Sequence, residues 1–235
     1  MLSAIVVAAG SSRRMGFDKM MAPLAGECVL WHSLHVFGQM PEVGQIILVT
    51  RPDRLEEMRS LAQRAAPLKN VSLVEGGEER YLSVWSGLQA LDVEATDFVA
   101  IHDGARPLIT AEAIRACAQL AKRDGAACCA SPIPDTVKRA DGEGFVVESV
   151  ERSGLWAMQT PQVFSCDLIV QAYVAIMARN DMVTDEVSAV QKLGRRVALY
   201  RNEDWNFKIT FKRDLEMAEQ VLRLREEGSR GGGER

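Results

Sequence analysis

The residues with the clearest potential for chemistry follow the first apolar run of the chain. They combine small residues, which let backbone N–H groups approach an anion, with cations that can bind the same anion. The small residues are Ala8, Ala9, Gly10, Ser11 and Ser12, and the cations are Arg14 and Lys19. This composition predicts a phosphate-binding loop. It is not a Walker A loop, because no G-K-[ST] follows, and its glycines do not fit the dinucleotide fingerprint G-x-G-x-x-G.

Two further polar clusters each follow an apolar run. Glycines between a strand and a helix can receive a nucleotide, and a carboxylate and a guanidinium at the end of a buried strand lie where α/β folds place their active sites. The first cluster contains Gly77, Glu78 and Ser83, and the second contains Asp103, Gly104 and Arg106. An ordinary turn and a structural ion pair are the alternatives, so each cluster alone is a weak indication.

The remaining candidates are scattered over the second half of the chain. They are Thr136, Arg152, Thr160, Thr184 and Lys208. Thr184 opens the run Thr184-Asp185-Glu186 at the start of an expected helix, where simple N-capping explains it equally well. None of these residues indicates a reaction without its context.

Composition and charge exclude several classes of protein. The chain has 235 residues, 47% of them hydrophobic, and a formal net charge of −4, so it lacks the positive excess of a general nucleic-acid binder. No stretch reaches the roughly 20 apolar residues of a membrane span, and the first apolar run is too short for a signal peptide. We therefore expect a cytoplasmic protein. The five cysteines include no C-x-x-C pair, which argues against a disulfide framework and a zinc site.

Apolar runs alternate with amphipathic segments along the first half of the chain. The runs at 4–9, 45–50, 71–74, 97–103 and 126–131 are continuous, as in strands that are covered on both faces. Helical spacing is found near 29–39, 53–65, 81–91 and 111–123, then at about 166–179, 185–193 and 212–227, with a strand at 195–201. This order predicts an α/β fold with a mostly parallel sheet flanked by helices, in a single domain over residues 1–227.

Two segments depart from that rhythm. Residues 132–163 contain prolines and a glycine-rich turn, which predicts an extended β-arm inserted into the sheet domain. Residues 228–235 are glycine-rich and polar, and we expect them to be disordered.

Taken in order, these motifs resemble the 2-C-methyl-D-erythritol 4-phosphate cytidylyltransferases of non-mevalonate isoprenoid biosynthesis. The resemblance covers residues 4 to about 215 and seven motifs: AAGSSRRMGFDK, GG-x2-R-x2-SV-x2-GL, HDGARP, TVKR, ER-x2-LW-x3-TPQ, TDE-x-S and N-x-K-x-T. It implies a Rossmann-like sheet whose β-arm is used for dimerisation, and a homodimeric enzyme. The implied reaction transfers a cytidylyl group from CTP to the sugar-alcohol phosphate and releases pyrophosphate.

The resemblance also assigns roles to residues. Arg14 and Lys19 would bind the CTP triphosphate, and the small residues at 8–12 would form the loop around it. Gly77, Glu78 and Ser83 would surround the cytosine and ribose. The sugar-phosphate side would consist of Asp103, Arg106, Thr160, Thr184 and Lys208, with Thr136 and Arg152 supplied by the partner subunit's arm. Arg14, Lys19 and Lys208 would carry the catalysis, and Asp103 and Gly104 would also touch the nucleotide.

Such chemistry needs no catalytic nucleophile from the protein. A phosphate monoester, with a second pKa of about 6, is already largely ionised at neutral pH. The requirement is for cations and a divalent ion such as Mg²⁺, held mainly by the phosphates of CTP. A ribitol 5-phosphate cytidylyltransferase and a non-catalytic nucleotide-binding regulatory module are the alternatives that the residues leave open.

The chain departs from the family pattern beside the loop lysine. Asp18 and Met20 stand where the family usually has proline and glutamine. An acidic residue next to a phosphate-binding lysine is expected to weaken the positive potential at that lysine.

Overall fold

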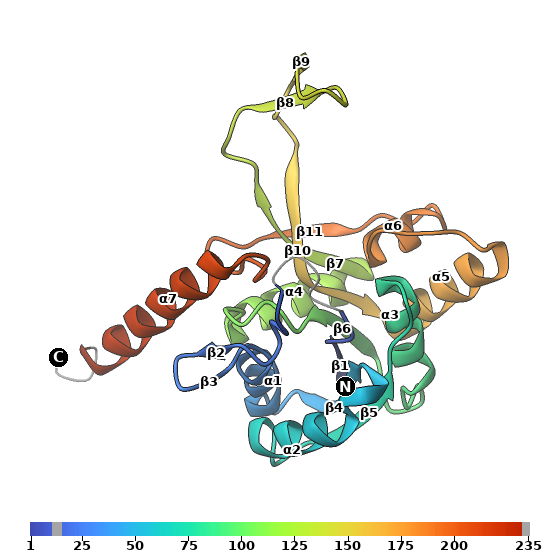
Figure 1. The fold of residues 1–235 in the computed structure, drawn as a ribbon. Helices are drawn as coiled ribbons and strands as arrows, with labels where there is room; N and C mark the ends of the chain where they lie inside the picture. The colour runs from blue at the N-terminus through green and yellow to red at the C-terminus, as the bar shows by residue number, and fades with distance from the viewer. Residues whose placement is uncertain (11–15, 232–235) are drawn as a thin grey trace.

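A seven-stranded sheet forms the centre of the molecule (Figure 1). The computed structural model describes residues 1–10 and 16–231, with side chains as far as Gly228. The strand order is β11-β7-β10-β6-β1-β4-β5. The strands are β1 (Leu2–Val7), β4 (Val43–Thr50), β5 (Asn70–Glu75), β6 (Phe98–Asp103), β7 (Ala126–Pro132), β10 (Trp156–Ser165) and β11 (Ala198–Arg201). β10 runs antiparallel to both of its neighbours, and the other pairings are parallel. The mostly parallel α/β sheet predicted from the sequence is confirmed.

Helices cover both faces of this sheet. They are α1 (Val29–Gln39), α2 (Leu55–Ala65), α3 (Arg80–Gln89), α4 (Ala111–Asp124), α5 (Cys166–Arg179), α6 (Glu186–Gln191) and α7 (Lys212–Gly231), with a 3₁₀ turn, η1 (Pro52–Arg54), before α2. Side chains of α1, α2 and α4 form one core layer, and those of α3, α5 and α6 form the other. In β1, Ala4 and Val6 join the first layer while Ile5 and Val7 join the second, which explains why the apolar run is continuous.

Local signals in the sequence begin and end the helices. Thr110 caps α4 by accepting a hydrogen bond from the Ala113 N–H, and Gly125 ends that helix with a φ of 84°. Asp185 caps α6 in the same way, through the Ser188 N–H. The N-capping alternative for the 184–186 run is therefore confirmed for Asp185.

α7 extends along one side of the molecule and packs on a small third core layer (Figure 1). Its Leu215, Ala218 and Leu222 contact this layer, which includes Leu24 and Val29. The helix continues to Gly231, four residues beyond its predicted end at 227. The expected disorder of residues 228–235 stays a prediction. Residues 232–235 lie outside the described chain.

A two-stranded hairpin projects from the sheet (Figure 1). It consists of β8 (Val137–Ala140) and β9 (Val146–Val150), and we call residues 133–155 the arm. Its turn is held by Asp141, whose Oδ1 accepts from the N–H groups of Glu143 and Phe145 at 3.0 and 2.9 Å. The other hairpin in the described chain, β2 (Pro23–Leu24) with β3 (Glu27–Cys28), leads into α1 and was not predicted.

The arm is shorter than the sequence predicts. The expected insertion, 132–163, includes most of β10, whose residues 162–165 pair with β6 inside the sheet, while its first residues rise toward the hairpin (Figure 1). Pro161 makes this strand hard to recognise in the sequence, because proline cannot donate a backbone hydrogen bond to a neighbouring strand. The proline is accommodated here because the register of the pairing between β10 and β7 shifts between Met158 and Gln162.

Within the described residues, no helix is both long and apolar enough to cross a bilayer.

Candidate active site

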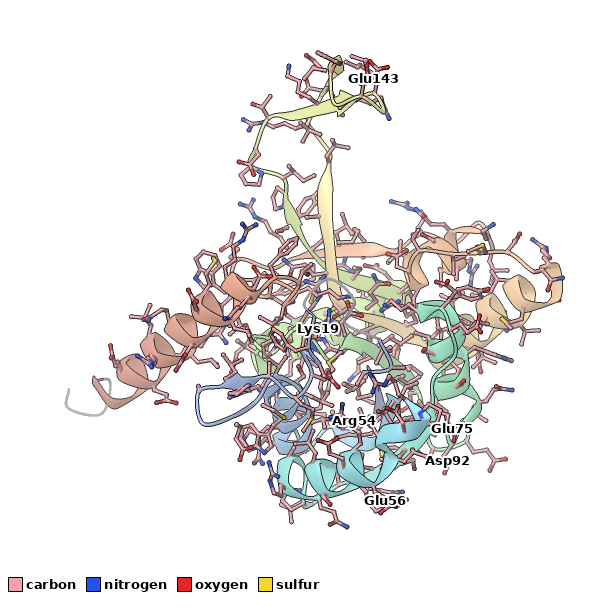
Figure 2. The ribbon with its side chains drawn as sticks, viewed as in Figure 1. Lys19, Arg54, Glu56, Glu75, Asp92 and Glu143 are labelled. Atoms are coloured by element: carbon pink, nitrogen blue, oxygen red, sulfur yellow. The ribbon has the colours of Figure 1, made fainter. Side chains whose placement is uncertain are left out.

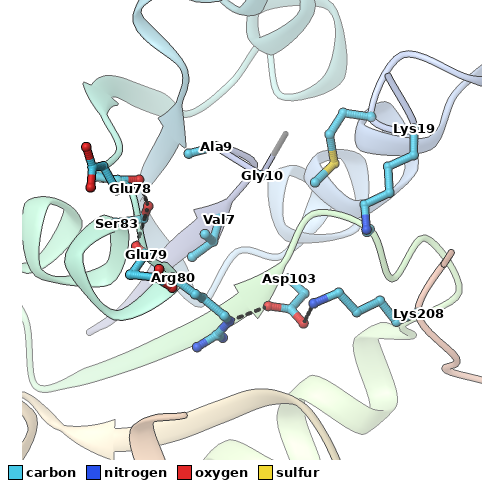
Figure 3. Close-up of a pocket in the computed structure, with 13 residues that line it drawn as sticks. Val7, Ala9, Gly10, Lys19, Glu78, Glu79, Arg80, Ser83, Asp103 and Lys208 are labelled. Atoms are coloured by element: carbon cyan, nitrogen blue, oxygen red, sulfur yellow. Dashed lines mark hydrogen bonds and ion pairs between the residues drawn. The ribbon is translucent and has the colours of Figure 1, made fainter. Parts of the chain in front are cut away.

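A cleft with a volume of about 620 Å³ opens at the carboxyl ends of β1, β5 and β6 (Figure 3). The chain leaves β1 toward β4 on one side and returns through β6 on the other, and α/β sheets bind ligands where the strand order reverses in this way. The cleft is lined by Val7, Ala9, Gly10, Lys19, Met20, Gly77, Glu78, Glu79, Arg80, Ser83, Asp103, Ala105 and Lys208. All three polar clusters singled out in the sequence contribute to it.

Small residues let the strand ends approach one another. A Cβ on Gly76 would lie 2.3 Å from the Ala9 Cβ, and one on Gly104 would lie 2.8 Å from Leu30 Cδ1. A Cβ on Gly10 would meet no atom of the described chain within 4 Å, so the backbone there borders open space. The cleft therefore exposes backbone to a ligand at Gly10, while Gly76 and Gly104 serve close packing.

Asp103, the last residue of β6, bridges two cations. Its Oδ1 accepts from Arg80 Nε at 2.9 Å, and its Oδ2 accepts from Lys208 Nζ at 2.8 Å. Figure 3 shows Arg80 and Lys208 reaching the carboxylate from opposite sides. Arg106 adds a third cation, with its Nε 3.7 Å from Oδ2.

Glu186 is the second carboxylate that pairs with Arg80. Its carboxylate is fully buried and accepts from Arg80 NH1 and NH2 at 2.5 and 3.1 Å. The Tyr173 hydroxyl donates to the same carboxylate at 3.1 Å. We call Arg80, Asp103, Glu186 and Lys208 the Asp103 cluster. It ties α3, β6, α6 and the segment before α7 together through charge-assisted hydrogen bonds.

Burial and charge shift the ionisation of this cluster. Burial alone would raise the pKa of Asp103, but Arg80, Lys208 and Arg106 hold it well below its ordinary value. Burial opposes the charge of Arg80, but Glu186 and Asp103 outweigh it and raise its pKa. The neighbouring His102 is fully buried, which lowers its pKa to about 4. At neutral pH Asp103 and Arg80 are therefore ionised, and the adjacent His102 is neutral.

Thr160 and Asn206 complete the wall beside Arg106. The Thr160 hydroxyl accepts from the Asp103 N–H at 3.0 Å, and Arg106 NH1 donates to the Asn206 carbonyl at 2.7 Å. Arg106 Nε and Asn206 Oδ1 are the buried side-chain atoms without a hydrogen bond among the described residues. Burial lowers the pKa of Arg106. Both atoms, Arg106 Nε and Asn206 Oδ1, are enclosed by the protein, and Arg106 is not among the residues that line the cleft.

The sequence profile of the family described as 2-C-methyl-D-erythritol 4-phosphate cytidylyltransferase matches residues 2–224. The chain belongs to this family. A relative of that name from Caldanaerobacter subterraneus subsp. tengcongensis is 38% identical, over 94% of this chain and 99% of its own. A bifunctional enzyme from Desulfotalea psychrophila is 41% identical over 95% of this chain and 57% of its own length. The crystal structure of a 4-diphosphocytidyl-2C-methyl-D-erythritol synthase from Anaerococcus prevotii has a TM-score of 0.82 at 30% identity, over 95% of this chain and 98% of that one.

Most site residues predicted from the family resemblance lie at the cleft. Ala9, Gly10, Lys19, Gly77, Glu78, Ser83, Asp103 and Lys208 line it. Ala8 and Gly104 are buried beside it, and Arg106 and Thr160 contact Asp103. Ser11, Ser12 and Arg14 lie outside the described residues. Lys19 lies on the cleft wall, as the family resemblance predicts. The residue is only 9% exposed, and its Nζ donates to the Ile209 carbonyl at 3.1 Å. Lys19 is therefore more enclosed than an ordinary loop lysine.

Three further predicted residues neither line the cleft nor contact Asp103 in this single chain. Thr184 is exposed and pairs with the Ser188 hydroxyl at 3.1 Å. Thr136 and Arg152 are exposed on the arm, where the Arg152 guanidinium donates to the Pro134 carbonyl. Their predicted roles stay predictions.

Arg80 and Glu186 occur within the family motifs, but no role was predicted for them. Arg80 is the first residue of α3 and follows Gly77 by three positions. Glu186 is the single charge in the buried-face pattern of α6, EVSAVQ, and an acidic residue in such a pattern signals a buried partner. That signal was available from the sequence, although the identity of the partner, 106 positions away, was not.

Proposed function

We propose that this chain transfers a cytidylyl group from CTP to 2-C-methyl-D-erythritol 4-phosphate, with release of pyrophosphate. The observation that carries the proposal is a cleft at the sheet's switch point with three lining cations, Lys19, Arg80 and Lys208, in a chain whose net charge is −4. Glu78, Glu79 and Asp103 line the same cleft and offset these cations. A polyanionic substrate would therefore be held by directed hydrogen-bond donors of the lysine, arginine and backbone N–H groups, and not by a net positive charge. Membership of the cytidylyltransferase family supports the choice of CTP and of this acceptor.

The nucleotide fits the side of the cleft formed by β1, β5 and α3. Gly77, Glu78 and Ser83 line that side, and we assign them to the cytosine and ribose. Backbone acceptors at a strand exit can receive the cytosine amino group, which uridine lacks, and a buried polar group without its partner is costly. Lys19, with Arg14, is assigned to the triphosphate.

The acceptor phosphate fits the side formed by Asp103, Arg106 and Lys208. Its oxygen forms a bond to the α-phosphorus of CTP, the bond from that phosphorus to the bridging oxygen of the β-phosphate breaks, and the electron pair leaves with pyrophosphate. Because the attacking phosphate is already ionised, no proton has to be removed. The chain's cations bring the two anions together and stabilise the charge that develops.

The donor set suits a magnesium ion that is held mainly by phosphate. Among the described residues, no group of three or more His, Cys, Asp or Glu side chains could hold a metal ion. Asp103, a carboxylate that lines the cleft, already accepts from two cations. Mg²⁺ commonly binds through substrate phosphates and retains several waters. When bound, the ion would neutralise charge on the triphosphate, and Asp103 is the carboxylate that could contact its shell.

We further propose a homodimer in which the arm of one protomer completes the cleft of its partner. Phe145, Val146 and Val147 are 68%, 65% and 58% exposed at the end of the arm, an apolar run that a lone subunit leaves in water. Exchange of an identical element is a known route to a two-fold dimer. In this arrangement Thr136 and Arg152 act in the partner's cleft.

A pyrophosphate-release assay tests the activity directly. The purified protein is supplied with Mg²⁺, one nucleotide (CTP or UTP) and one acceptor, either 2-C-methyl-D-erythritol 4-phosphate or ribitol 5-phosphate. We expect rapid release with CTP and the methylerythritol phosphate alone. Turnover that prefers ribitol 5-phosphate would reassign the acceptor, and binding of CTP without turnover on either acceptor would favour a regulatory module.

A further inference from the structure

Asp18 places a negative charge directly before the lysine that we assign to the triphosphate. The sequence suggests that this charge weakens the site. In the structure both oxygens of its carboxylate are occupied: Oδ1 accepts from the Met20 N–H at 2.9 Å, and Oδ2 pairs closely with NH1 of Arg54. The loop lysine is therefore flanked by a carboxylate that has its own cation.

Arg54 comes from a different part of the fold. It is the last residue of η1, immediately before α2, and it is 36 positions from Asp18 in the sequence. Figure 2 labels Arg54 and Lys19. Arg54 is not among the residues that line the cleft, so it does not reach the ligand itself.

The Arg54 pair is better shielded than the other ion pairs near α2. Its side chains are 19% and 24% exposed, against 58% and 35% for the Arg64–Glu27 pair. Exposed pairs are screened by salt, while partly buried pairs are screened much less. The pair can therefore influence the local field in a way that a surface pair cannot.

Among the described residues, Arg54 is the cation whose ion pair with Asp18 the structure shows. Arg51 is engaged by Asp53, with its NH2 2.6 Å from Oδ2. Arg54 also contacts Glu57, which is more exposed at 46%. Loss of Arg54 thus removes the cation that pairs directly with Asp18 and leaves an extra negative charge beside Lys19.

We propose that Arg54 is an accessory residue of the nucleotide site, which cancels the charge of Asp18 so that Lys19 keeps its attraction for the triphosphate. The inference rests on the proposed function because it takes CTP as the anion. Arg54 acts through Asp18 and is not a catalytic residue.

Three variants separate charge compensation from a simple loop anchor: Arg54→Ala, Asp18→Asn and the double variant. Asparagine retains the Oδ1 acceptor for the Met20 N–H. We expect Arg54→Ala to raise the KM for CTP by about threefold to tenfold at low salt, with kcat unchanged. Asp18→Asn should leave KM at or below the wild-type value, and the double variant should return close to it. Added salt should shrink the effect of Arg54→Ala.

Arg64→Ala is the matched control, because it removes another paired arginine from the same region without touching Asp18. It should leave the KM for CTP unchanged. If Arg54→Ala has no effect on KM, or if Asp18→Asn and the double variant raise KM as much as Arg54→Ala does, charge compensation is wrong.

Calorimetric titration with CTP alone keeps this inference separate from the proposed function. A wild-type protein that binds CTP but does not turn over overturns the function, and the order of the Kd values among the three variants still decides the role of Arg54. If the wild type binds neither CTP nor inorganic triphosphate, the inference is overturned as well.

Discussion

Charged residues have different roles in the Asp103 cluster, at the cleft, and in the arm. In the Asp103 cluster, Glu186 is fully buried and each carboxylate oxygen has a donor. On the arm, Arg139 and Glu148 pair at 2.9 Å but are 64% and 59% exposed. Buried pairs depend strongly on each partner, while exposed pairs contribute little. Charged residues therefore fix the geometry of the Asp103 cluster, while removing an ion pair from the arm is expected to change the stability of the arm very little.

The largest expected effect concerns activity and connects the two regions. Lys19→Met and Arg152→Ala should each lose most turnover, Lys19→Met by about 10²–10³, because each removes a cation to which we assign a phosphate contact. If the arm acts on the partner's cleft, mixed dimers made by unfolding and refolding the two variants together contain one site with neither defect. Random pairing then restores roughly a quarter of the sites. Recovery no greater than the sum of the separate variants, in confirmed mixed dimers, would show that Arg152 acts within its own subunit.

The next effect is on stability. Glu186→Ala removes the fully buried partner of Arg80, whose own side chain is 26% exposed and keeps Asp103. Removing one member of a buried pair costs at most about 3–5 kcal/mol in the free energy of unfolding. Tyr173→Phe removes one hydrogen bond to the same carboxylate and should cost only about 1 kcal/mol. Urea denaturation measures both. A loss below that of Tyr173→Phe for Glu186→Ala would mean that the Asp103 cluster does not depend on Glu186.

His102 gives the cleft floor a pH dependence. Burial lowers its folded pKa to about 4, below the ordinary value, so the unfolded chain binds the extra proton between pH 6.5 and 4. The stability that comes from burying the neutral ring is present above that window and is lost as the pH falls through it, by about 3 kcal/mol in total. His102→Gln should flatten the unfolding free energy over this range. An unchanged slope would contradict the assignment.

The smallest expected effect is the change in unfolding free energy when an ion pair of the arm is removed. Arg139→Ala removes an exposed pair and should change the free energy of unfolding by less than about 0.5 kcal/mol. A loss comparable with that of Glu186→Ala would end the distinction between the two regions.

Sequence patterns predicted the elements that have a single strong signal. The strands β1, β4, β5 and β6 appear as continuous apolar runs, and the polar residues that follow three of them meet in the cleft. Most of β10 was assigned to the arm because it follows two prolines and a glycine-rich turn, although its pairing with β6 and β7 makes it central. Strand order depends on pairing between distant segments, which periodicity does not encode.

Contacts between distant residues limited the prediction of the site in the same way. The enclosure of Lys19 depends on Ile209, and the pairing of Asp18 depends on Arg54. Each residue type was visible in the sequence, and the family resemblance identified the cleft. The partners that set their charge and exposure emerge only when the chain is folded.

The position of β10 has a consequence for how the chain folds as it is synthesised. β10 lies between β6 and β7, so these two strands do not pair with each other. A nascent chain that ends after β7 has strand edges with no partner until residue 165 has left the ribosome. Unpaired edges invite association with other chains, and late non-local pairing is slow. The stage of synthesis at which β6 and β7 have been made but β10 has not is thus one at which the incomplete sheet is open to aggregation.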